Sequence, residues 1–136
     1  MDELTKSLRV SAAGMRAQGT RLRIITENIA NADSTAASPG GEPYRRKTIS
    51  FNNVLDRSLG ADTVRVDKVS QDPSPFVRKY DPGNPAADAS GYVQTANVNP
   101  LIEMADMREA QRSYEANLSS IKSAKAMLQQ TIDVLR

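Results

Sequence analysis

The two ends of the chain share one hydrophobic pattern, in which apolar residues recur at alternating spacings of four and three. This spacing is typical of heptad a and d positions, and it predicts long amphipathic helices at about residues 3–31 and 100–135. The first stripe consists of Leu4, Leu8, Ser11, Met15, Gln18, Leu22, Ile25, Ile29 and Ala32. The second consists of Met104, Met107, Gln111, Tyr114, Leu118, Ile121, Lys125, Leu128, Ile132 and Leu135. Each predicted helix therefore has one narrow apolar seam.

The beginning of the second predicted helix is marked by its capping residues. Asn99 suits the N-cap position, and Pro100 suits the first helical position, where its missing N–H costs nothing. Glu103 and Asp106 follow, and acidic residues are favoured near the positive end of the helix dipole. We therefore expect this helix to begin at Pro100.

The middle of the chain is rich in turns. All seven prolines lie between residues 39 and 100, and the strings PGGEP, DPSP and DPGNP are typical of turns. Short stretches of alternating polarity lie at residues 44–51, 63–69, 76–80 and 92–98. We interpret these stretches as small hairpins or extended arms.

The fold predicted from these segments is mainly α. Residues 1–32 and 100–136 form two long antiparallel terminal helices, which together make a coiled-coil-like axial domain. Residues 33–99 form a turn-rich middle arm with small, irregular β-hairpin or extended structure. The antiparallel arrangement follows because the middle arm leaves one helix and returns to the other.

Aligning the two seams end to end predicts the register of the helix pair. Leu4 then lies near Leu135, so that paired residue numbers total about 137 to 139. In this register Glu27 lies beside Arg108 and Arg112, which places opposite charges together. Such surface pairs are worth about 0–1 kcal/mol each, so they select the register more than they stabilise it.

An ordinary helix hairpin that buries its own seam is the simplest reading of these stripes, but two helices of this length leave Leu and Ile exposed on their outer flanks. We therefore predict a subunit that polymerises through its terminal helices, and whose isolated ends, residues 1–30 and 101–136, are frayed. The predicted interface residues are Leu4, Leu8, Met15, Leu22, Ile25, Asn28, Ile29, Asn31, Met104, Met107, Tyr114, Leu118, Ile121, Leu128, Ile132 and Leu135.

Two asparagines near the end of the first helix admit two interpretations. Asn28 and Asn31 could be local features, since Asn is tolerated at helix ends and in left-handed C-caps. They could also fix the register between packed helices, as polar groups in a seam do at some cost in stability. The sequence leaves both interpretations open.

The composition argues against an enzyme. Cysteine and histidine are both absent from the 136 residues, which removes the thiolate nucleophile, the imidazole base and the commonest zinc ligands. Ser119 and Lys122 have the spacing of a serine nucleophile and its lysine base, but the companion motifs are absent, so a solvated helix face explains them better. We predict no catalytic residue, no cofactor and no metal site.

Charge and hydropathy narrow the choice of partners. The formal net charge is +2, from 18 basic and 16 acidic residues, so nucleic acid is a poor candidate. No run of about 18 apolar residues is available for direct membrane insertion. The start of the chain does not look like a cleavable secretory signal, so any export would follow a route that reads no Sec signal.

Several strings resemble the family of flagellar axial proteins, which includes rod and hook proteins. SAAGMRAQ (11–18) and ENIANADST (27–35) look like the amino-terminal signature of that family. PGGEPYRRK (39–47), DPSPFVRKYDPGNPAADASGYV (72–93) and NVNPLIEMADMREAQRSYEANL (97–118) look like a proximal rod member. Ala96 stands where the family often has proline, and residues 52–70 match no signature, but the resemblance covers nearly the whole chain.

The resemblance implies a structural subunit of the bacterial flagellar basal-body proximal rod, a helical tube that transmits torque. It implies export by the flagellar type III apparatus without a Sec signal, followed by assembly in the periplasm. The implied partners are other copies of the chain, FlgB, FliE and the distal rod proteins. FlgB is a rod protein of similar size and is the alternative identity within the family.

Other classes of protein remain as alternatives. A coiled-coil adaptor or an export chaperone would share the helices but would not need the turn-rich middle. A membrane-surface protein would need a basic helix face, and the basic residues of the first helix are too widely spread: Lys6, Arg9, Arg16, Arg21 and Arg23. Sedimentation of the chain, alone and with rod proteins, discriminates between these classes.

Overall fold

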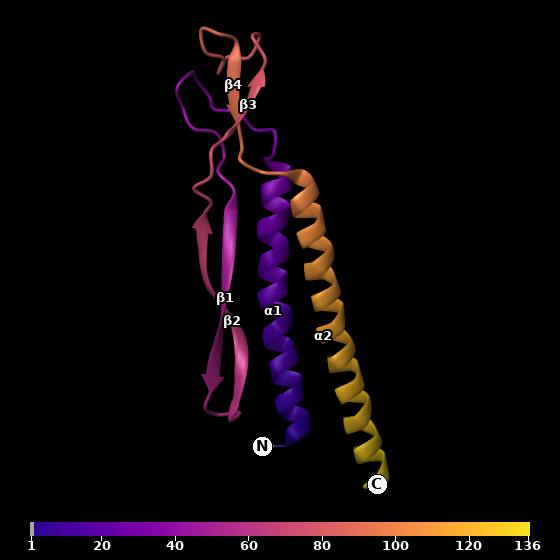
Figure 1. The fold of residues 1–136 in the computed structure, drawn as a ribbon. Coiled ribbons are helices and arrows are strands. Elements are labelled where there is room, and N and C mark those ends of the chain that lie inside the picture. The colour runs from indigo at the N-terminus through magenta and orange to yellow at the C-terminus, as the bar shows by residue number, and fades with distance from the viewer. Residues whose placement is uncertain (1) are drawn as a thin grey trace. The chain divides into compact units, whose positions relative to one another are not determined.

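The computed structural model describes residues 2–136, which form two long helices and two two-stranded sheets (Figure 1). The elements are α1 (Glu3–Ala30), β1 (Lys47–Asp56), β2 (Ala61–Gln71), β3 (Val77–Tyr80), β4 (Tyr92–Thr95) and α2 (Pro100–Val134). The predictions of two terminal helices, and of short strands between them, are confirmed. β1 and β2 are longer than predicted and include residues 52–56 and 61–62.

Both helices begin at side-chain caps. The backbone N–H of Leu4 donates to Asp2 Oδ1 at 3.3 Å, and the N–H of Leu101 donates to Asn99 Oδ1 at 3.1 Å. These side chains satisfy N–H groups that have no partner within the first helical turn. The predicted N-cap at Asn99 is confirmed.

The chain folds into two compact units, which we describe separately. The helical unit comprises residues 2–22, 50–68 and 108–136. The arm unit comprises residues 23–49 and 69–107. Each unit therefore joins segments that are far apart in the sequence.

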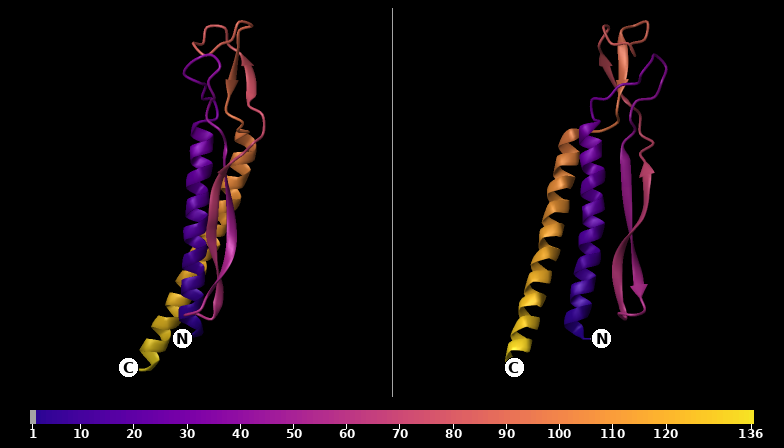
Figure 2. Two further views of the ribbon diagram at one scale, coloured as in Figure 1. Left: turned by 90° about the vertical axis from the view of Figure 1, so that its left-hand side faces the viewer. Right: turned by 180° about the vertical axis from the view of Figure 1, so that it is seen from behind.

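In the helical unit, α1 lies between the β1–β2 hairpin and α2, as the views from the front and from behind show (Figures 1 and 2). The hairpin turn is closed by the N–H of Gly60, which donates to Asp56 O at 2.8 Å. Gly60 has a φ of +64°, a conformation that favours glycine. Leu59, beside it, is buried and anchors the turn.

The helix segments of this unit run antiparallel, but their register differs from the predicted one. A methyl group on Gly14 would lie 2.8 Å from Asn117 Nδ2, and Arg21 Nη2 lies 3.6 Å from Glu109 Oε2. The numbers of these paired residues total 131 and 130, about one heptad below the predicted 137 to 139. The predicted register is therefore wrong.

Small residues explain the shift in register. The buried positions of α2 in this unit are Ala110 and Ala124, and Asn117 lies halfway between them at heptad spacing. The predicted seam instead used Gln111, Leu118 and Lys125, each one residue later along the helix. The distance between packed helices depends on the side chains at the contact, and matching large apolar residues overlooked a contact made by Gly and Ala.

Replacing Gly14 by alanine is expected to destabilise the helical unit, although alanine is the better helix former. The added methyl would meet the Asn117 amide, which is held by a 3.0 Å hydrogen bond to Ser113 O, and such crowding costs about 1–3 kcal/mol. Gly19→Ala is the matched control, because nothing lies within 4 Å of its added methyl. The control should gain up to about 1 kcal/mol. Thermal unfolding of the assembled protein, followed by circular dichroism, measures both changes, and equal gains at the two positions would contradict the observed register.

The corrected register also removes one predicted ion pair. In the arm unit, Glu27 Oε1 accepts a hydrogen bond from Lys47 Nζ at 2.6 Å. This contact replaces the predicted pairing of Glu27 with Arg108 and Arg112. The acidic residue therefore connects α1 to the start of β1.

The arm unit is built on the shorter sheet. β3 and β4 pair antiparallel, with Val77 opposite Thr95 and Tyr80 opposite Tyr92, and Thr35 bridges to Thr95 from the other side. The apolar cluster of this unit is small and consists of Ala32, Ala96 and Val98, with Tyr44 packed against them. So small a cluster buries little apolar surface, and polar contacts must supply much of the stability.

Candidate assembly interface

The interface residues predicted from the two seams differ widely in burial. Ile25 and Asn28 are buried. The half-buried ones are Leu4, Leu8, Met15, Leu22, Ile29, Asn31, Met107, Tyr114, Leu118 and Ile121. The exposed ones are Met104, Leu128, Ile132 and Leu135. The predicted α2 seam is thus covered in its middle and uncovered toward both ends.

The end of α2 carries the most exposed apolar side chains of the helical unit. All residues from 125 to 136, which we call the α2 tail, are exposed. Leu128 is 39% exposed, Ile132 43% and Leu135 81%. In the observed register residue 128 stands opposite residue 3, where α1 begins. The α2 tail therefore extends beyond its partner helix.

A second exposed apolar group lies at the beginning of α2, in the arm unit. Leu101, Ile102 and Met104 are exposed, whereas Glu103 between them is only 1% exposed. This turn of helix buries its charge and exposes its apolar side chains, the reverse of the usual distribution. Exposed apolar groups of this kind mark surfaces that bind other proteins.

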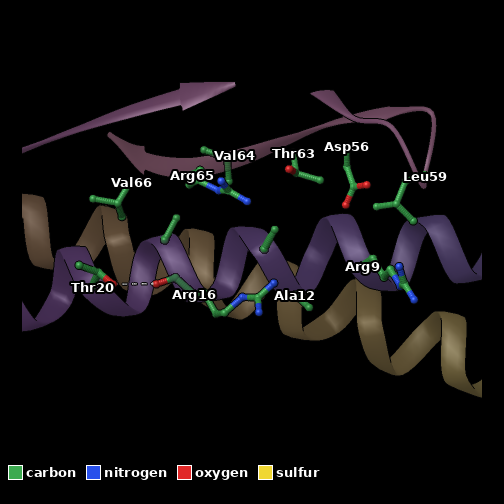
Figure 3. A pocket seen from close by; sticks show the side chains of 12 residues that line it. Arg9, Ala12, Arg16, Thr20, Asp56, Leu59, Thr63, Val64, Arg65 and Val66 are labelled. Atoms are coloured by element: carbon green, nitrogen blue, oxygen red, sulfur yellow. Dashed lines mark hydrogen bonds between the residues drawn. The ribbon is translucent and has the colours of Figure 1, made fainter. Parts of the chain in front are cut away.

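A groove of about 590 Å³ lies between α1 and the hairpin in the helical unit (Figure 3). Small side chains on α1, including Ala13 and Ala17, leave this space open beneath Leu59. Hydrogen bonds from Ser58 lower the pKa of Asp56 below its ordinary value. The charged residues that line the groove are Arg9, Arg16, Asp56 and Arg65. Mixed charge around an apolar floor suits contact with another protein.

Arg46 joins four segments of the arm unit. Its Nε is hydrogen-bonded to Glu103, and its guanidinium nitrogens lie 3.3 Å from Asp72 Oδ2 and 3.8 Å from Asp106 Oδ2. Its backbone N–H donates to Asn97 Oδ1 at 2.7 Å. One arginine at the start of β1 thus binds the turn after β2, the segment after β4 and the first turns of α2.

The electrostatics of this cluster favour its ion pairs. Burial lowers the pKa of Arg46, but hydrogen bonds and charge attraction from Glu103 and Asp72 outweigh it and raise the pKa above its ordinary value. Hydrogen bonds from Ser74 hold the pKa of Asp72 below its ordinary value. Glu103 Oε2 is buried and has no hydrogen-bond partner among residues 2–136. Arg46 is therefore the cation that compensates the buried carboxylate.

Asn28 fits neither interpretation drawn from the sequence. Its Nδ2 donates to Lys47 O at 2.9 Å, and its Oδ1 accepts from Lys47 N at 2.9 Å and from the Tyr44 hydroxyl at 2.7 Å. It therefore binds the start of β1, and not a second helix. Asn31 lies one residue beyond the end of α1, and its Nδ2 donates to Glu27 O of that helix at 2.8 Å, which is the helix-end contact of the local interpretation.

Burial raises the pKa of Tyr44 to about 12, and the charges of Glu27 and Glu103 act in the same direction. The hydroxyl of Tyr44 therefore stays protonated at neutral pH and donates to Asn28. Sequence reasoning missed this contact and the Arg46 cluster. The charged string YRRK (44–47), where β1 begins, is the sequence feature that could have indicated them. Charged side chains that become buried in a folded unit need partners.

No helix among residues 2–136 is long and apolar enough to cross a membrane. In the same part of the chain, no three acidic side chains are grouped so that they could hold a metal ion.

Two family models match the chain at its helical ends. The model described as "Flagella basal body rod protein" matches residues 8–36, and the model described as "Flagellar basal body rod FlgEFG protein C-terminal" matches residues 89–134. These matches cover most of α1 and all of α2.

Curated relatives match the chain over nearly its whole length. A flagellar basal-body rod protein FlgC from Agrobacterium fabrum is 52% identical over 100% of this chain and 98% of its own. The proteins of that name from Bacillus subtilis and Salmonella typhimurium are 39% and 38% identical, over 94% and 90% of this chain and 95% and 91% of their own. The chain therefore belongs to the family of flagellar basal-body rod protein FlgC, whose members are structural rod subunits and not enzymes.

Proposed function

We propose that the chain polymerises through its terminal helices into the helical tube of the proximal rod, which transmits torque. In this proposal residues 1–32 and 100–136 form the axial coiled-coil domain, and residues 33–99 form the middle arm. The sixteen residues predicted from the seams form the interface within and between chains. The exposed members contact neighbouring chains directly, and the half-buried members shape the helix pair.

The observation that carries this proposal is the exposed apolar face of the α2 tail. Leu128, Ile132 and Leu135 recur at the spacing of one helix face and are 39%, 43% and 81% exposed. Burying one such side chain completely contributes about 1.5–3 kcal/mol. Neighbouring subunits that cover this face would therefore gain a large hydrophobic contribution, repeated at every subunit of the tube.

The family implies assembly with other rod and basal-body proteins. The specific neighbours that we propose are other copies of the chain, FlgB, FliE and the distal rod proteins. The chain would reach the periplasm through the flagellar type III export apparatus, without a Sec signal, and would enter the rod there. Exposed apolar groups at both ends of α2 give such neighbours two separate surfaces to cover.

Hydrogen exchange is expected to distinguish the isolated chain from the rod. Residues 3–22 and 108–134 should exchange fast in the monomer, because helices with an uncovered seam are marginal in water. The same amides should exchange slowly in the assembled rod. Sedimentation identifies the monomeric and the assembled sample. Strong protection of both segments in a verified monomer would contradict polymerisation-dependent ordering.

A further inference from the structure

Residues Tyr44–Lys47, which we call the clamp segment, make polar contacts with many parts of the arm unit. Tyr44 and Lys47 bind Asn28 of α1. The guanidinium of Arg45 donates to the backbone oxygens of residues 72 and 74, at 2.9 and 3.1 Å. Arg46 binds the first turns of α2. Four consecutive residues therefore connect the end of one helix to the start of the other.

Asn28 recognises the clamp segment as a neighbouring strand would. Its amide donates to the carbonyl of Lys47 and accepts from the N–H of the same residue. This two-way pairing satisfies both backbone groups of one residue, as an antiparallel neighbour does. An asparagine amide can do this because it is both donor and acceptor. Asn28 is 1% exposed, so water does not replace these bonds.

Asn97, in the segment that follows β4, also binds the clamp segment. Its Oδ1 accepts from Arg46 N, and its Nδ2 donates to the oxygens of Asp72 and Ser74 at 3.1 and 3.0 Å. Asn97 is 8% exposed. Two buried amides therefore hold consecutive backbone N–H groups, those of Arg46 and Lys47.

We infer that the clamp segment, held by Asn28 and Asn97, couples the end of α1 to the start of α2, so that the arm unit orders as one cooperative body. The small apolar cluster of this unit leaves that coupling to polar contacts. Residues 23–30 and 100–107 then remain ordered in the isolated chain, in contrast to the fraying of residues 1–30 and 101–136 predicted from the sequence. This inference concerns the monomer and stands independently of polymerisation.

Hydrogen exchange in the full-length monomer tests the clamp with Asn28→Ala. The N–H of Lys47 loses its partner directly, so the informative amides are two that Asn28 does not bind. They are the N–H of the adjacent Arg46, bonded to Asn97, and the N–H of Glu103 in α2, bonded to Asn99 O. We expect both to exchange about tenfold faster, the effect of losing buried hydrogen bonds. Tyr44→Phe removes only the hydroxyl and should accelerate the exchange of the same two amides by a smaller factor. This variant provides the test if Asn28→Ala fails to fold.

Asn31→Ala is the matched control, because Asn31 directly follows α1 and its amide donates to Glu27 O of that helix, not to the clamp segment. It should leave the exchange of Arg46 and Glu103 unchanged. A response to Asn28→Ala confined to residues 47–49 would overturn the inference. So would equal responses to Asn28→Ala and Asn31→Ala, or fast exchange of Lys47 N–H in the unaltered monomer.

Discussion

Cells that carry Ile132→Asp in this chain are expected to lose swimming, with normal expression of the protein. Ile132 is 43% exposed in the α2 tail, so an aspartate there meets water in the monomer and leaves its fold intact. In the rod the same carboxylate would be buried without a partner, at a cost of several kcal/mol for each subunit contact. Expansion of colonies in soft agar, with immunoblots for expression, measures the effect.

The matched control is Gln130→Asp, because Gln130 is also exposed in the α2 tail but lies on the opposite helix face. It places the same charge in the same turns of helix and should leave swimming intact. The same change at Leu22 or Leu118 is a less clean test, because both are half-buried within the chain. Normal swimming with Ile132→Asp would count decisively against assembly through the α2 tail.

The helices were predictable because their signals are local and repeated. The α2 N-cap was found from Asn99 and Pro100 alone, and heptad spacing gave both helices to within one or two residues. The register was not predictable from the same pattern, because the contact is made by Gly14, Ala110 and Ala124. Periodicity of large apolar residues indicates which side of a helix is buried, but small residues decide how closely two helices approach.

The polar contacts of the arm unit were beyond sequence reasoning for a different reason. Asn28 pairs with Lys47 across 19 residues, and Arg46 pairs with Glu103 across 57. No spacing rule connects positions so far apart. Each residue also has an ordinary local explanation, such as a helix-end asparagine or an exposed arginine before a strand. Only the folded arrangement shows that these side chains replace a larger apolar core.

Replacing Arg46 by leucine is expected to unfold the arm unit locally. Glu103 is 1% exposed and would lose its compensating cation, and breaking a buried pair in this way costs about 3–5 kcal/mol. Native-state hydrogen exchange measures the loss of stability, for example at the N–H of Asp81. This amide donates to Gly91 O at 2.9 Å, and both residues are far from residue 46 along the sequence. We expect this amide to lose nearly all its protection.

The double variant Arg46→Leu/Glu103→Leu separates charge from packing. It removes both partners, and replacing a buried ion pair by apolar residues is often neutral or stabilising, so much of the lost protection should return. Glu103→Leu alone should be milder than Arg46→Leu, because Arg46 is 24% exposed and keeps Asp72 and Asp106 as partners. This asymmetry follows directly from which ion is buried. If the double variant were as unstable as Arg46→Leu, the uncompensated Glu103 carboxylate would not be the cause, and the hydrogen bond of Arg46 to Asp72 and its ion pair with Asp106 would have to carry the stability instead.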